Sequence, residues 1–146
     1  MPVYEVEPRE GVGPVRLGAS RDDVRAAVSD PPESFQKGAH ELYEVDAFDR
    51  LGLHVHYGGD SPAVEFIEAF PVNGVRFALG GVDLFGSPAA EVVAGLAGRY
   101  AVAEEEEGCS FVVPELDIAL WRESPDDETF ESAGVGESGY FGDVAV

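Results

Sequence analysis

His54 and His56 stand two residues apart in an alternating stretch, so on a strand both imidazoles point to the same face. Two imidazoles placed in this way can share a Zn²⁺ ion if a third ligand, His40 or Glu68, comes close. Zinc sites usually reveal their third and fourth ligands by spacing, and no such spacing follows here. The sequence therefore favours an exposed sheet face that carries two histidines over a metal site.

The sequence motifs of the common enzyme classes are absent. The chain has no Ser-His-Asp order, no P-loop, no His-Glu-x-x-His and no Cys-x-x-Cys pair, and Cys109 is its only cysteine. We therefore predict no catalytic residue and no cofactor. The alternative is a small-ligand or metal-binding protein, or an enzyme, that uses the sheet face with His54 and His56.

Aromatic and acidic side chains are the candidates for contacts with a partner. On a strand with Ile118 and Leu120, Trp121 points to the opposite face, and a half-exposed tryptophan is a typical binding anchor. A tryptophan covered by a loop or by a second copy of the chain fits the pattern equally well. The acidic runs are typical of solvated turns, with a second use as a patch for a basic partner. The predicted partner-binding residues are Trp121, Tyr57, Tyr43, Glu104, Glu105, Glu106, Asp126 and Asp127.

The charge balance narrows the class of partner. The chain of 146 residues carries 29 acidic and 9 basic side chains, a net charge of −20. Nucleic acids and anionic membranes would be repelled by such a surface, so neither is predicted as a partner. A basic protein partner or adaptation to high salt fits the charge. The oligomeric state stays open.

The same charge predicts how salt changes stability. The melting temperature should rise between low salt and about 1 M NaCl, by an amount equivalent to a few kcal/mol at most, because salt shortens the screening length to about 3 Å. Thermal melts in a NaCl series test this. A flat or falling series would mean that the carboxylates are already compensated by neighbours or by a bound cation.

Local signals place two helices and several strands. Ser20 is a good N-cap for a first helix, and Ser87-Pro88 starts a second. Strands are predicted over 3–6, 41–48, 51–57, 64–70, 110–113, 116–120 and 129–133. The glycine-rich tail is expected to fold back on the core.

The segment Leu17-Gly18-Ala19-Ser20-Arg21-Asp22-Asp23-Val24 recurs in pattern as Phe85-Gly86-Ser87-Pro88-Ala89-Ala90-Glu91-Val92, and alternating stretches follow both copies. This self-similarity predicts internal repeats over about 12–72 and 80–141. The predicted fold class is α+β: two tandem α-β-β-β units in one compact domain over 1–146, with helices packed on one face of an antiparallel sheet.

The repeated motif resembles that of the BamE-like family, and its duplication is similar in plan to the β-lactamase inhibitor proteins. The resemblance implies a fold that grips other proteins, and it supplies no catalytic residue. The chain lacks the lipoprotein signal of the first group and the cysteine pairs of the second. An acidic start without an apolar stretch makes the bacterial cytoplasm the expected location. The sequence thus favours an immunity-like or inhibitor-like binding protein.

Overall fold

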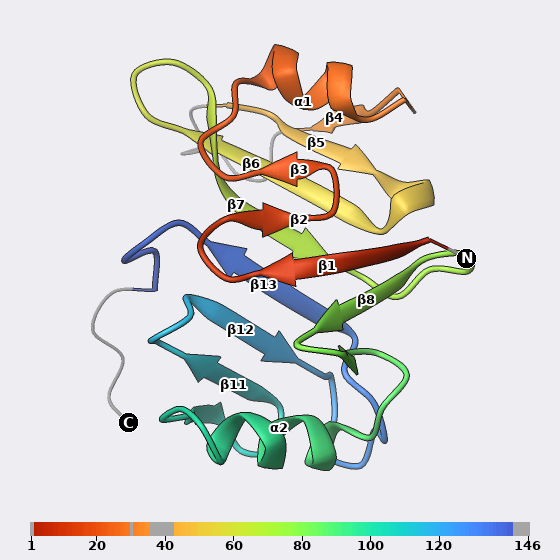
Figure 1. Cartoon of the computed structure of the whole chain (residues 1–146), viewed down its shortest axis with the longest axis vertical. Helices are drawn as coiled ribbons and strands as arrows, with labels where there is room; N and C mark the ends of the chain where they lie inside the picture. Colours follow the sequence, from red (N-terminus) through yellow and green to blue (C-terminus); the bar gives the residue numbers. More distant parts are fainter. Residues whose placement is uncertain (1, 30, 36–42, 142–146) are drawn as a thin grey trace.

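Most of the chain forms β-strands, and these make two sheets that pack face to face (Figure 1). The computed structural model describes residues 2–29, 31–35 and 43–141. The larger sheet is antiparallel throughout and runs β10-β11-β12-β13-β7-β6-β5-β4. Its strands are β4 (Glu33–Phe35), β5 (Val45–Phe48), β6 (Leu53–Gly58), β7 (Ala63–Ala69), β10 (Ala103–Glu106), β11 (Ser110–Val113), β12 (Ile118–Trp121) and β13 (Ser132–Gly136).

The smaller sheet lies across the middle of the larger one and runs β3-β2-β1-β8-β9. Its strands are β1 (Val3–Glu7), β2 (Gly11–Val12), β3 (Val15–Arg16), β8 (Arg76–Leu79) and β9 (Val82–Asp83). The strand predicted over 3–6 is β1, an interior strand that pairs with β2 on one side and in parallel with β8 on the other.

Two short helices stand at opposite ends of the molecule in Figure 1. Helix α1 (Arg21–Ala27) begins as predicted, because the Ser20 hydroxyl accepts a hydrogen bond from the backbone N–H of Asp23 at 3.1 Å. Helix α2 (Ala89–Ala97) has Pro88 as its N-cap residue, and a 3₁₀ turn, η1 (Asp49–Leu51), precedes β6. Neither helix in the described part of the chain is long and apolar enough to cross a membrane.

The predicted α+β fold class is wrong. The described residues form 13 strands in sheets of five and eight, with only two short helices, so the fold is mostly β. The tandem α-β-β-β unit is not borne out, since four strands of the larger sheet, rather than three, follow each helix, and β8 and β9 of the smaller sheet come between the two units. The reason is the smaller sheet, which is built from the segments just before each helix and packs where helices alone were expected.

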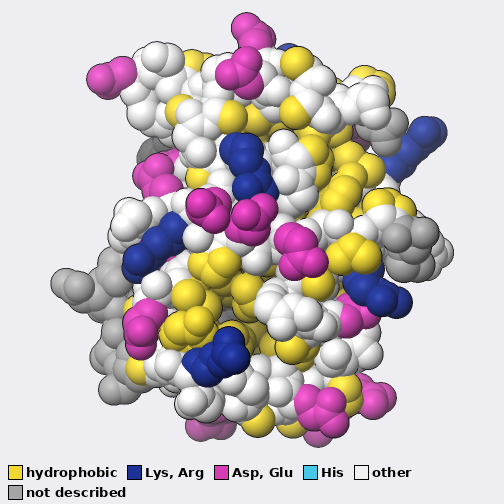
Figure 2. All heavy atoms as spheres, in the orientation of Figure 1, with side chains coloured by type: hydrophobic (Ala, Val, Ile, Leu, Met, Phe, Trp, Pro, Cys, Tyr) yellow, Lys and Arg dark blue, Asp and Glu magenta, His cyan; other side chains and the backbone are white. Residues whose placement is uncertain are grey.

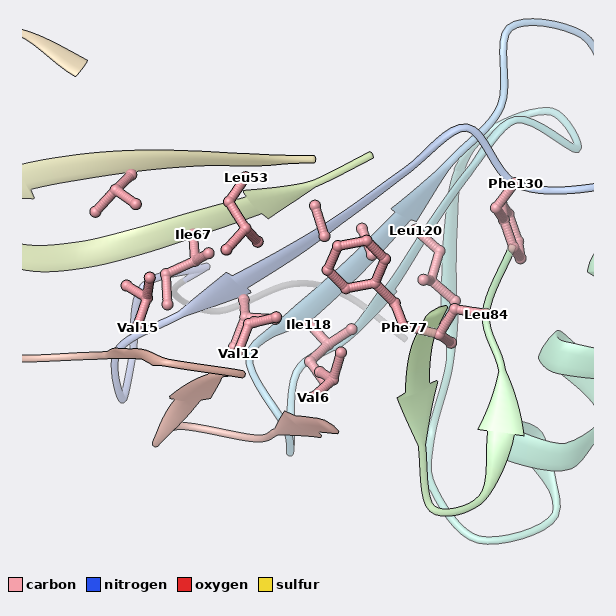
Figure 3. Close-up of a cluster of buried hydrophobic side chains, with 14 of the residues drawn as sticks. Val6, Val12, Val15, Leu53, Ile67, Phe77, Leu84, Ile118, Leu120 and Phe130 are labelled. Atoms are coloured by element: carbon pink, nitrogen blue, oxygen red, sulfur yellow. The ribbon is translucent and has the colours of Figure 1, made fainter. Parts of the chain in front are cut away.

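The core fills the space between the two sheets (Figure 3). Figure 3 shows Val12 and Phe77 of the smaller sheet pointing toward Ile67 and Ile118 of the larger one. All four side chains are at most 1% exposed. Strand alternation explains this arrangement, because every second residue of each strand faces the other sheet. The opposite face of the larger sheet, called the outer face below, points away from this core.

Candidate functional site

The outer face carries the exposed tryptophan that the sequence predicted. In β12, Ile118 and Leu120 point into the core, so Ala119 and Trp121 lie on the outer face. Trp121 is 39% exposed. Its cross-strand neighbours on this face are Ser110 of β11 and Ser132 of β13. These are small, so the indole stands above the strands beside it.

A trough of about 530 Å³ lies next to the indole. Its floor consists of small residues at neighbouring positions of three strands: Ser110, Ala119, Ser132 and Gly134. Its remaining walls are aromatic side chains of β7 and the residue after it, Phe66 and Phe70. The trough therefore combines a flat floor with aromatic sides, a shape that suits an extended side chain laid along the sheet.

Gly134 is needed for this shape. A Cβ atom there would lie 2.5 Å from Cζ of Phe66, so the Phe66 ring covers the glycine directly. Tyr140 in turn stacks on Phe66, with ring centroids 4.7 Å apart and an interplanar angle of 9°. The tail thus folds back as predicted, but Tyr140 meets the outer face.

Two carboxylates give the trough its charge. Glu68 faces Gly134 across the β7–β13 pair, and its carboxylate has no hydrogen bond or ion pair with any other described residue. Glu131 also lines the trough, and its carboxylate accepts a hydrogen bond from the backbone N–H of Glu123 at 2.9 Å. No basic side chain of the described ranges lines the trough. A cation bound in the trough would be attracted by these carboxylates, and the faces of aromatic rings attract cations as well.

The structure separates the other predicted partner-binding residues. Glu106 lies in the same cross-strand row as Ser110 and Trp121, whereas Glu104 pairs with Phe111 and Glu105 lies at the irregularity in β10. Asp126 and Asp127 lie in the loop between β12 and β13, where the Asp127 carboxylate accepts a hydrogen bond from Ser124 N–H. Of the predicted set, Glu106 therefore shares a cross-strand row with Trp121, but it does not line the trough.

The two predicted tyrosines face inward. Tyr57 is only 3% exposed, so it offers no surface to a partner. It lies on the inner side of β6, because the side chains of Leu53, Val55 and Tyr57 alternate with those of the two histidines. Tyr43 is half-buried, and its hydroxyl donates to the Gly59 carbonyl at 3.0 Å.

The two predicted metal ligands, His54 and His56, pack against aromatic side chains of the outer face, next to the trough. The His54 ring packs between Phe35 and Phe70, at centroid distances of 5.6 and 4.7 Å, and its Nε2 lies 3.2 Å from Oδ1 of Asp49. His56 is 8% exposed and packs on Phe66. Within the described ranges, no three His, Cys, Asp or Glu side chains gather closely enough to hold a metal ion. His40, a predicted third ligand, lies outside the described residues.

Sequence reasoning missed a buried polar cluster on the other side of the same sheet. Asp46 of β5 is fully buried, and Arg25 of α1 donates to both of its oxygens, at 3.0 and 2.8 Å. The hydroxyls of Ser34 and Tyr57 each donate to Asp46 at 2.9 Å. The guanidinium of Arg21 lies 4.6 Å from the Tyr57 ring centre. The only sequence signal was an acidic residue within a predicted strand.

These contacts shift two pKa values in opposite directions. Burial alone would raise the pKa of Asp46, but the hydrogen bonds from Arg25, Ser34 and Tyr57 outweigh it and hold that pKa below its ordinary value. Burial and the hydrogen bond to Asp46 raise the pKa of Tyr57 well above its ordinary range. Because Asp46 is inaccessible to solvent, this cluster anchors α1 to the sheet and offers no reaction site.

Comparison of the chain with family models, curated proteins and solved structures gives no match. The resemblance to BamE-like and inhibitor proteins therefore stays a prediction from the sequence, and arguments about function rest on the residues of the outer face.

Proposed function

We propose that this protein is a non-catalytic binding protein of the bacterial cytoplasm, and that its trough binds a basic segment of another protein. The observation that carries the proposal is that Trp121, which is 39% exposed, lines the same trough as Glu68 and Glu131. An arginine side chain laid in the trough would stack on the indole and pair with a carboxylate at the same time.

The overall charge supports a basic partner. With a net charge of −20, the protein attracts cationic partners over long range, which speeds their encounter and disfavours acidic competitors. The trough then supplies the short-range contacts. Exposed Phe35 and Tyr140, at 39% and 40%, extend the aromatic surface beyond the trough on the same face.

The alternative, a metal site or enzyme at the histidine pair, has less support. The His54 ring packs between two aromatic rings, and its Nε2 lies near an aspartate that is itself exposed. The His54 imidazole therefore lies next to the Asp49 carboxylate, and no serine, threonine or cysteine side chain among the described residues is bonded to it.

A tetra-arginine amide peptide tests the proposal directly, since Trp121 is the only tryptophan and its fluorescence reports on the trough alone. We expect the peptide to shift and quench this emission saturably, and to bind more weakly as NaCl is added. Glu68→Gln should weaken binding about tenfold, because a hydrogen bond to a charged group contributes about 1.5–3 kcal/mol.

Glu105→Gln is the matched control. It removes the same charge from an exposed position outside the trough, so binding should change less than about twofold. A tetra-glutamine amide peptide should leave the emission unchanged. Equal losses in Glu68→Gln and Glu105→Gln, or equal binding of the two peptides, would contradict the proposal.

A further inference from the structure

A second concave site lies on the opposite side of the molecule, away from the outer face. It is a cleft of about 480 Å³ between α2, the β8–β9 hairpin and the end of β1, called the α2 cleft below. Figure 2 shows hydrophobic side chains gathered around a hollow in this region, between β1 and α2. The apolar wall of the cleft includes Val6, Leu79, Val82, Leu84, Val92 and Leu96. The volume lies within the range of small-molecule sites.

Gly95 keeps this cleft open. It lies within α2 and lines the cleft, and a Cβ atom placed on it would meet no other atom within 4 Å. A glycine inside a helix lowers stability by about 1 kcal/mol relative to alanine. Gly95 therefore lowers the stability of α2, and it does so at a position where any larger side chain would extend into the cleft.

The cleft also contains an arginine without a partner. Six of the eight described arginines bond to a carboxylate or a backbone carbonyl, but the side chains of Arg99 and Arg50 bond to no described residue. Arg99 lines the α2 cleft and is exposed, and Tyr100 lines it as well. In a chain with 29 acidic side chains, an unpaired guanidinium beside an apolar cleft is a specific feature.

Acidic residues at the cleft limit the charge of a ligand. The Glu7 carboxylate is paired with Arg16 at 2.9 Å, whereas Glu10 and Glu91 are exposed and also line the cleft. Two anionic groups on one ligand would meet these carboxylates, but a single one can pair with Arg99. We propose that the α2 cleft binds a small aliphatic monocarboxylate, with its chain against the apolar wall and its carboxylate on Arg99. This site is independent of the trough and of the proposed function.

Decanoate and decanol are the probes, because they share an alkyl chain and differ in charge. We expect calorimetric titration to show saturable binding of decanoate, about tenfold tighter than that of decanol, from one charge-assisted contact. Arg99→Gln should lower decanoate affinity about tenfold and leave decanol unchanged. Arg50→Gln, which removes the other unpaired guanidinium, should change neither.

Two leucine variants test the location. Gly95→Leu places a side chain in open space and should abolish binding of both probes, while its melting temperature holds or rises because leucine favours the helix. Ala94→Leu adds the same bulk at an exposed position of α2 outside the cleft, and should bind both probes as the parent does.

Several outcomes would overturn the assignment. They are absence of saturable decanoate binding, equal decanoate affinity of the parent and Arg99→Gln, or full binding by Gly95→Leu. Trp121 emission separates the two sites, since Arg99→Gln should bind tetra-arginine amide as the parent does and Glu68→Gln should bind decanoate as the parent does. Failure of either site would therefore leave the other standing.

Discussion

Replacing Asp46 by alanine is expected to lower the free energy of unfolding by about 3 kcal/mol, the lower end of the cost of breaking a buried charge pair. The carboxylate is fully buried and accepts from Arg25, Ser34 and Tyr57. Its removal strands the buried Tyr57 hydroxyl and the guanidinium that ties α1 to the sheet. Since the Arg25 side chain is 41% exposed, water compensates it in part, which places the cost at the lower end.

Urea unfolding of the parent and of Asp46→Ala measures this cost. Asp60→Ala is the control, because Asp60 is exposed in the turn between β6 and β7, and its loss should stay within about 0.5 kcal/mol. Equal stability of the two variants would mean that the cluster does not hold α1 in place.

The pH dependence of the same residue has a definite sign. Because the folded-state pKa of Asp46 lies below its ordinary value of 3.8, the carboxylate stabilises the fold above that pH. This contribution falls as the pH drops through the folded-state pKa. The stability difference between the parent and Asp46→Asn should therefore be constant above about pH 5 and shrink below about pH 4. A difference that grows on acidification would contradict the assigned charge state.

Local signals in the sequence were sufficient for the central strands of the larger sheet but not for β4 or β10, whose residues were not predicted as strands. The alternation over 51–57 and 64–70 predicts strands that the structure confirms as β6 and β7, and 110–113 matches β11. Ser20 predicted the start of α1 from side-chain chemistry within one turn. These features depend on neighbours a few residues apart, which a single sequence displays directly.

The smaller sheet depends on pairing over long range. Tyr4 of β1 pairs with Phe77 of β8, so two segments far apart in the chain form its centre. No periodicity within either segment reveals that partner. The strand predicted over 129–133 was likewise placed too early, because the residues from Gly134 onward were assigned to the glycine-rich tail. Within the fold these glycines lie beneath the rings of Phe66 and Tyr140.

The candidate sites follow the same division. Trp121 was predicted from strand alternation alone, whereas its closeness to Glu68 depends on the β13–β7 pairing of distant segments. Tyr57 was wrongly predicted to contact a partner. Its alternation with the histidines shows that it lies on the opposite face of the strand from them, but it does not show which of the two faces is buried. Arg99 and Gly95 gave no signal, since an unpaired charge and an unfilled space exist only in the folded structure.

Phe77→Ala is expected to cost about 3–5 kcal/mol of unfolding free energy, the range for deleting a buried phenyl ring. Phe77 is 1% exposed, and its ring makes edge contacts with Tyr4 and Phe85 at centroid distances of 5.9 and 5.6 Å. It points from the smaller sheet toward the larger one (Figure 3). The substitution would leave a cavity between the two sheets, at the contact made by the smaller sheet, which the sequence did not predict.

The matched control is Phe35→Ala, the same substitution at a ring that is 39% exposed on the outer face. Its loss should be about 1–2 kcal/mol and clearly smaller than that of Phe77→Ala, because part of the Phe35 ring stays in water and its removal leaves no enclosed cavity. Phe77→Leu should cost less than Phe77→Ala, since leucine refills part of the cavity. Urea unfolding of the three variants gives the comparison. If Phe77→Ala cost no more than Phe35→Ala, the smaller sheet would not be packed on the larger one, and the wall of the α2 cleft would lose its support.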